Sequence, residues 1–150
     1  MAESFDLERF VAAQQGVYDG ALDELRAGRK VGHWIWFIFP QIAGLGHSAT
    51  SQHYAIATLE EARAYLAHPV LGPRLRESAA TVLATTDRTA LEIFGSIDAM
   101  KLRSSMTLFH RAAPDEALFA QVLTRFFGGI PDEATDDRVE AHGREGETAG

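Results

Sequence analysis

Two short segments concentrate the side chains that could bind an anionic ligand. The first runs from Arg29 to Trp36 and places two cations, an imidazole and two indoles within eight residues. Cations pair with phosphate and an indole can stack on a flat ring, so this composition fits a phosphorylated aromatic molecule. Large aromatic side chains pack in cores more often than they bind ligands, so the alternative is a solvated pair of cations beside buried indoles. The candidates are Arg29, Lys30, His33, Trp34 and Trp36.

The second segment surrounds Lys101 in a predicted helix. Ser105 lies one helical turn from Lys101, and Ser104 lies beside them. An ammonium flanked by hydroxyls can hold a phosphate, or act as a base if its pKa is lowered. The alternative is that Lys101 extends its ammonium to solvent or pairs with an acid. Two further polar candidates for either cluster are Gln41 and Tyr54.

Other motifs associated with catalysis do not occur. The sequence contains no phosphate-binding loop, no nucleophile elbow and no His-Glu-x-x-His pattern. Residues 44–49 match a loose Gly-x-Gly-x-x-Ala dinucleotide pattern, but Pro40 interrupts the strand that should precede it, so a simple loop is predicted. None of the six histidines has the spacing of a helical zinc site. No metal and no cofactor are predicted.

Composition indicates one soluble globular domain. The chain has 150 residues, of which 46% are hydrophobic and 23% charged. Its longest apolar run, residues 34–39, is far shorter than the roughly 20 residues that span a bilayer, so no membrane partner is expected. The absence of cysteine excludes thiolate chemistry and fits a reducing compartment, and no signal peptide is evident. A cytoplasmic location is therefore predicted.

Charge is distributed unevenly along the chain. Residues 131–150 hold seven of the 21 acidic residues and two of the 14 basic ones, so this segment accounts for −5 of the net charge of −7. The remainder is almost neutral and offers no basic surface for duplex nucleic acid. We therefore predict a single helical domain over residues 1–130 and an acidic, disordered tail over residues 131–150.

Helical signals recur along residues 1–130. Apolar residues at helical spacing over residues 7–25 predict one long helix, with Asp6 as its N-cap and Gly28 at its end. Residues 34–39 have the composition of a buried strand, but no other segment alternates as a partner strand would. We therefore predict a short buried helix that ends near Phe39, because the residue before Pro40 disfavours helix.

Capping patterns define the remaining helices. Thr58 with Glu61 and Thr89 with Glu92 fit capping boxes. Gly95 is expected to end the short helix that starts at Thr89, and further helices follow. The last is predicted to begin at Pro114, and a helix is also predicted from Ser48 to about Tyr54. The sum is an all-α, compact single-domain bundle of about six to eight helices without a significant sheet.

The chain also resembles an uncharacterised all-α bacterial family, domain of unknown function 1810. The resemblance runs from about Phe5 to Gly129 and implies a compact helical fold; it implies no activity. It is carried by three segments among others, His33-Trp34-Ile35-Trp36-Phe37-Ile38-Phe39-Pro40-Gln41, Gly44-Leu45-Gly46 and Lys101-Leu102-x-Ser104-Ser105-Met106-Thr107-Leu108-Phe109.

Two functions remain open on these grounds. The first is a binder or hydrolase of a phosphorylated, nucleotide-like small molecule, with His33 and Lys101 as the candidate catalytic groups. It requires the two segments to meet in the fold. The second is a non-enzymatic interaction module, including a homodimer, and it requires a contiguous exposed apolar patch. Whether the protein is an enzyme is left open.

Overall fold

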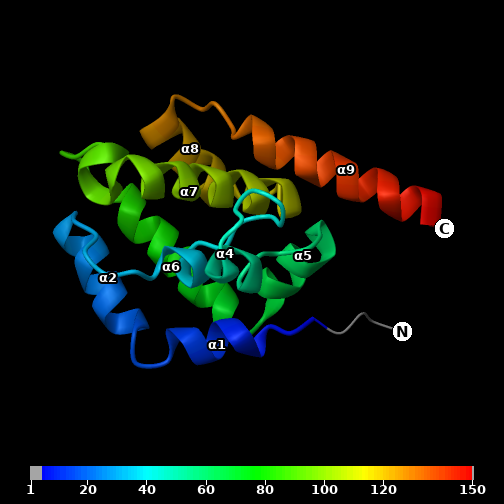
Figure 1. Ribbon diagram of the computed structural model, residues 1–150. Coiled ribbons are helices and arrows are strands. Elements are labelled where there is room, and N and C mark those ends of the chain that lie inside the picture. The colour runs from blue at the N-terminus through cyan, green and yellow to red at the C-terminus, as the bar shows by residue number, and fades with distance from the viewer. Residues whose placement is uncertain (1–4, 150) are drawn as a thin grey trace.

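The computed structural model describes the backbone of residues 5–149 and the side chains of residues 5–141. Residues 1–4 of the predicted domain and Gly150 of the predicted tail lie outside the described residues. The described chain forms nine helices and no sheet (Figure 1), which confirms the all-α prediction. The helices are α1 (Glu8–Gln14), α2 (Tyr18–Ala27), α3 (Ile35–Ile38), α4 (Ala49–His53), α5 (Leu59–Ala67), α6 (Leu71–Leu83), α7 (Ala90–Ala112), α8 (Ala117–Phe127) and α9 (Glu133–Ala149).

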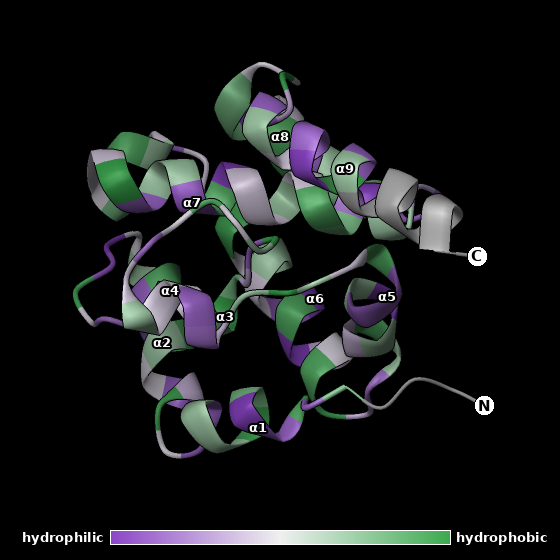
Figure 2. Cartoon of the chain, turned by 45° about the vertical axis from the view of Figure 1, so that its right-hand side comes forward, coloured by the Kyte–Doolittle hydropathy of each residue, from purple (hydrophilic) through white to green (hydrophobic). Residues whose placement is uncertain are grey.

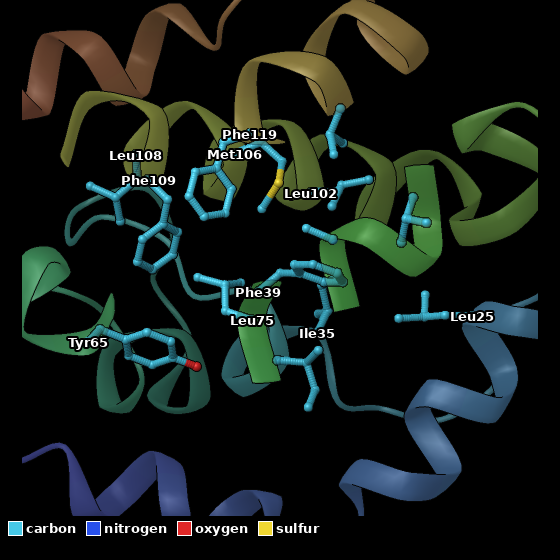
Figure 3. Close-up of a cluster of buried hydrophobic side chains, with 14 of the residues drawn as sticks. Leu25, Ile35, Phe39, Tyr65, Leu75, Leu102, Met106, Leu108, Phe109 and Phe119 are labelled. Atoms are coloured by element: carbon cyan, nitrogen blue, oxygen red, sulfur yellow. The ribbon is translucent and has the colours of Figure 1, made fainter. Parts of the chain in front are cut away.

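The hydrophobic core lies between α7 and a layer formed by α3, α5 and α6, while α8 packs on α7 and α6 (Figure 1). The rings of Tyr65, Phe109 and Phe119 are fully buried and succeed one another at centroid distances of 5.4 and 5.9 Å. Figure 3 shows Phe39 and Met106 beside them in the same cluster. Because α7 contributes buried residues to this core along its length, its exposed face is held in a fixed position.

The aromatic segment forms the short buried helix predicted for it. Helix α3 ends at Ile38, and Ile35 and Phe39 are almost fully buried. Trp36 and Phe37 are only half-buried. The segment therefore belongs mainly to the core, and one of its two indoles, Trp36, reaches the surface.

The prediction of one long first helix was wrong in two respects. The chain breaks between α1 and α2 at Gly16, whose φ of +75° is left-handed. Leu7, and not Asp6, is the N-cap residue of α1, and no side chain accepts a capping bond there. Gly28 ends α2 as predicted, with φ +73°, and the side chain of Arg88 lies against its Cα.

The threonines of the two predicted capping boxes both cap their helices. The Thr89 hydroxyl accepts from the Glu92 N–H, and the Glu92 carboxylate accepts from the Thr89 N–H. Thr58 also caps α5, but Glu61 does not complete that box. Its carboxylate instead accepts from the Ala57 N–H at 2.7 Å and pairs with a guanidinium from α1.

Helix α7 is bent at Gly95, whose φ of 78° and ψ of 168° are not helical. Gly95 thus ends one short helix, as predicted, and a second begins directly after it. At the C-terminal side, α8 begins at Ala117, three residues later than the predicted start at Pro114.

Composition predicts a disordered tail from residue 131, but the structure has helix α9 there, and its first turns pack on α7. Thr135 is fully buried, and the Arg111 guanidinium holds the Asp136 carboxylate through two bonds of 2.8 and 3.0 Å. The Arg103 guanidinium donates to the carbonyl oxygens of Ile130 and Pro131. Specific contacts with α7 therefore order a segment whose composition alone favours disorder.

No helix among the described residues has the length and apolar content to cross a membrane.

Candidate functional site

A cleft of about 460 Å³ lies on the exposed face of α7, between the loop that follows α3 and the start of α9. Figure 2 shows α7 and α9 side by side at this end of the molecule, with hydrophilic residues along α9. The lining is mainly apolar with a few polar groups, as in many small-molecule sites. It consists of Trp36, Gln41, Leu45, Gly46, His47, Ser48, Ser51, Ile97, Met100, Lys101, Ser104, Asp132 and Ala134.

The first polar feature of the cleft is the ammonium of Lys101. It lies 4.5 Å from the centroid of the Trp36 ring and 3.4 Å from the Asp98 carboxylate. Asp98 also forms an ion pair of 2.7 Å with Lys30, whose side chain is only 6% exposed. One carboxylate, that of Asp98, thus faces two ammonium groups, and the charge of Lys30 also acts on Glu24.

A second polar feature lies one helical turn further along α7. The hydroxyl oxygen of Ser104 is 2.8 Å from that of Thr135, which donates to Asp132 Oδ2 at 2.6 Å. Asp132 Oδ2 also accepts from the Thr135 N–H at 2.9 Å and so caps α9. This chain of bonds joins the floor of the cleft to the C-terminal helix.

Of the ten predicted binding residues, the structure brings four to the lining of the cleft. They are Trp36, Gln41, Lys101 and Ser104. Lys30 lies behind them and reaches Lys101 through their common partner Asp98. The two segments identified from sequence therefore meet in the fold, as the first functional hypothesis requires.

Five of the predicted residues lie elsewhere. Arg29 and His33 are exposed outside the cleft. Trp34 is buried and donates its indole N–H to Glu24. Tyr54 packs against Phe10 and Phe37. Ser105 is fully buried on the core side of α7, because successive residues of a helix point to different faces, so Ser105 does not share the face of Ser104. The candidate catalytic His33 is therefore not part of this site.

Sequence reasoning missed the other lining residues. The loop residues 45–48 belong to the loose dinucleotide pattern, which was interpreted as a simple loop, and Ser51 in α4 gave no chemical signal. Ile97 and Met100 are 71% and 65% exposed, which a predicted helix does not reveal in advance. Asp132 was assigned to the tail. A cap pattern was available there, since Asp132 precedes a helical stretch, but the surrounding charge obscured it.

A half-buried acid fixes the loop that presents Trp36. Glu24 Oε1 accepts from the N–H groups of Val31 and Gly32 at 2.6 and 2.9 Å and from the Trp34 indole at 3.0 Å. Burial acts to raise the pKa of Glu24, but these bonds and the charge of Lys30 outweigh it, so the pKa lies below its ordinary value. An ionised Glu24 thus stabilises the approach to α3.

The two glycines of the loose dinucleotide motif have steric roles. At Gly44, with φ +99°, a Cβ would lie 2.8 Å from the guanidinium carbon of Arg138 on α9. At Gly46 a Cβ would lie 2.6 Å from the Ser51 hydroxyl. These glycines let the loop approach α4 and α9 closely, and Gly46 lines the cleft.

The cleft is suited to binding a flat or apolar molecule that carries an anion. Ile97, Met100 and the Trp36 ring supply apolar contact, and Lys101 supplies a positive charge. Within the part of the chain whose side chains are described, no three His, Asp or Glu residues are grouped so that they could hold a metal ion.

A second depression, of about 680 Å³, lies between the C-terminal ends of α2 and α6. Its charged residues carry both signs, Arg26 and Arg88 against Glu77 and Asp87, and all four are exposed. It contains none of the residues predicted to bind a ligand. The cleft on α7 is therefore the better candidate.

Comparison with known proteins identifies relatives without an assigned activity. A family model described as "Protein of unknown function (DUF1810)" matches residues 4–139, a range that includes Asp132 and Thr135. The crystal structure of the conserved hypothetical protein Rv1873 from Mycobacterium tuberculosis is 49% identical in sequence and has a TM-score of 0.90, over 92% of this chain and 99% of that chain. No curated protein matches. The resemblance inferred from sequence is confirmed.

Proposed function

Because the chain belongs to DUF1810, a family described only as proteins of unknown function, we propose its function from the geometry of its own cleft. The protein binds a phosphorylated or otherwise anionic small molecule, nucleotide-like in having a flat or apolar body. The observation that carries this proposal is the position of the Lys101 ammonium, which lies over the Trp36 ring at the surface of a cleft lined largely by apolar groups.

Charge supports an anionic ligand. Lys101 shares Asp98 with Lys30, and of these two lysines it is Lys101 whose side chain lines the cleft. The side chain of Lys101 is 22% exposed, which leaves its ammonium accessible from the cleft. A cation in partly apolar surroundings attracts an anion more strongly than one in open water.

Binding is better supported than hydrolysis. The cleft hydroxyls are engaged with one another or with the backbone, since Ser48 bonds to Ser51 and Ser104 bonds to Thr135. Among the described residues, none of these three serines donates to a histidine or a carboxylate that would act as its base. The geometry therefore favours a ligand-binding protein over an enzyme with a serine nucleophile.

The test is thermal unfolding with a panel of NAD, ADP-ribose, nucleoside monophosphates and sugar phosphates. A ligand at 100 times its Kd stabilises the fold by about 2.7 kcal/mol, which raises Tm by several degrees. We expect at least one panel member to give this shift in the wild type and none to give it in Lys101→Ala.

Arg29→Ala is the matched control, because it removes an exposed cation outside the cleft. It should leave the shift intact. A shift that survives Lys101→Ala would contradict the proposed site. If no panel member raises the Tm of the wild type, the proposed ligand class is contradicted and a protein partner is favoured instead.

A further inference from the structure

We infer that Asp132 selects, among anionic ligands, those that also carry a hydrogen-bond donor. The ligand would then bear its anion near Lys101 and an amine or hydroxyl group near Asp132. This inference rests on the proposed function, because it adds a second recognition group to the same cleft.

Asp132 has one carboxylate oxygen in structural use and one that remains available. Oδ2 accepts two bonds from Thr135, from its N–H at 2.9 Å and from its hydroxyl at 2.6 Å. No donor bonds to Oδ1 within the part of the chain where side chains are described. Since Asp132 is half-buried and lines the cleft, its second oxygen is a charged acceptor for a ligand.

The direction of the neighbouring bonds adds a second acceptor. Thr135 has a single hydroxyl proton and donates it to Asp132. The Ser104 hydroxyl must therefore donate its own proton to Thr135. The Ser104 hydroxyl then keeps only lone pairs, and since Ser104 is 2% exposed, Asp132 is the accessible acceptor at this end of the cleft.

The cleft is thus polarised along α7. Lys101, a donor without acceptor capacity, lies three residues before Ser104 on the same helix, and residues so spaced are neighbours on one face. An anion placed near Asp132 would be repelled. A cationic donor placed near Lys101 would be repelled by its ammonium, and the acceptor beside it, Asp98, is already paired with Lys101 and Lys30. A ligand with opposite polarity at its two ends satisfies both groups.

Ligands of this chemistry include phosphate esters that bear an amine, and nucleotides, whose sugar hydroxyls and base amines are donors. Ile97 and Met100 project at the rim, where they would cover the apolar part between the two ends. A dianion without a donor satisfies only the Lys101 end and should bind more weakly.

Two probes isolate the effect. Phenyl phosphate carries a ring and an anion but no donor beyond its phosphate, and tyramine phosphate adds one ammonium group at the far end. We expect isothermal titration calorimetry to show tyramine phosphate binding the wild type about tenfold more tightly, the value of one hydrogen bond to a charged group.

Asp132→Asn tests the assignment without removing the helix cap, because asparagine caps helices as well as aspartate does. It replaces the acceptor with an amide and should abolish the preference for tyramine phosphate. Asp132→Ser, which also caps, is the second variant if the first unfolds. Asp137→Asn removes an exposed acid from the same helix and should keep the preference.

The outcomes separate the two claims. Equal affinity of the wild type for both probes, or a preference that persists in both Asp132 variants, would overturn the role of Asp132 while leaving the anion cleft intact. If neither phosphate binds the wild type, the proposed function itself fails.

Discussion

The ammonium of Lys101 lies 4.5 Å from the centroid of the Trp36 ring. The two residues are 65 positions apart and come from different helices, yet each was a candidate from its local sequence alone. Their contact requires α3 to pack against α7, which the buried residues on either side of Trp36 ensure. The site is therefore a product of the core.

Replacing Trp36 should weaken ligand binding more than it weakens the fold. In Trp36→Leu the half-buried indole is lost and Lys101 no longer has a ring beneath it, so affinity for a phosphate ligand should fall about fivefold. Calorimetry with the best ligand of the panel measures this. Trp34→Leu is the contrasting variant, because its buried indole bonds to Glu24 and its loss should lower Tm sharply. Equal affinity in Trp36→Leu and wild type would argue against the ring's role.

The shared carboxylate predicts opposite effects on binding from two variants. Asp98→Asn removes the negative charge beside Lys101 and should raise affinity for phosphate several-fold. In Lys30→Met, Asp98 keeps Lys101 as its one ammonium partner of the two, so the affinity for phosphate should fall. Both variants break a largely buried ion pair and should lose about 3 kcal/mol of stability, measured by urea unfolding. Since stability falls in both, affinity changes of the same sign would refute this electrostatic account.

A side chain at Gly44 should disturb the contact between the loop beside the cleft and α9. Gly44→Ala forces alanine to φ +99° and places its Cβ against the Arg138 guanidinium, at a cost of about 1–3 kcal/mol. Gly20→Ala is the matched control, because Gly20 lies inside α2 with open space around it. It should be neutral or slightly stabilising in thermal unfolding. A Gly44→Ala protein as stable as Gly20→Ala would show that the loop tolerates the side chain.

The two bonds from Arg111 to Asp136 should control how firmly α9 is held. Asp136 also keeps the pKa of Arg111 above its ordinary value, although burial opposes this. In Arg111→Met, hydrogen exchange at the first turns of α9 should accelerate about fivefold, since a bidentate pair of this exposure is worth about 1 kcal/mol. Arg125→Met, on α8, should leave exchange in α9 unchanged. If hydrogen exchange in α9 does not accelerate in Arg111→Met, the buried Thr135 is enough to hold the helix in place.

Glu24 predicts a pH dependence of stability. Because its pKa in the folded protein is below the ordinary value of 4.5, the ionised carboxylate stabilises the fold above about pH 4.5. That contribution is lost as the pH falls through the lowered pKa. The difference in unfolding free energy between wild type and Glu24→Gln should therefore be full at neutral pH and shrink in acid. Urea titrations across this range measure it, and a constant difference would contradict it.

Local signals predicted local structure well. The Thr89 capping box and the left-handed Gly28 and Gly95 depend on residues close in sequence, and each was found where expected. The break at Gly16 was not, because the apolar spacing continues across it. The end of α1 is instead held by a tertiary contact, because the buried Gln14 side chain donates to the Phe37 carbonyl at 2.7 Å.

The same distinction applies to the cleft. Lys101 and Trp36 were found because their types and neighbours are chemically distinctive. His33 is chemically distinctive in the same way, but its side chain is exposed to solvent. The direction of a loop side chain depends on tertiary contacts, and the spacing of residues in the sequence does not reveal them. Asp132 was missed because charge density favours disorder, whereas buried hydrogen bonds to α7 oppose it.

The contact between Thr135 and Ser104 has a practical consequence. A shortened chain that stops at Ile130, where composition changes, would keep every ring of the core but lose Asp132, Ala134 and Thr135 from one end of the cleft. Such a truncated protein should fold, but its ligand affinity would differ from that of the full chain. Binding assays on this family therefore belong on chains that extend at least through Arg138, whose side chain covers Gly44.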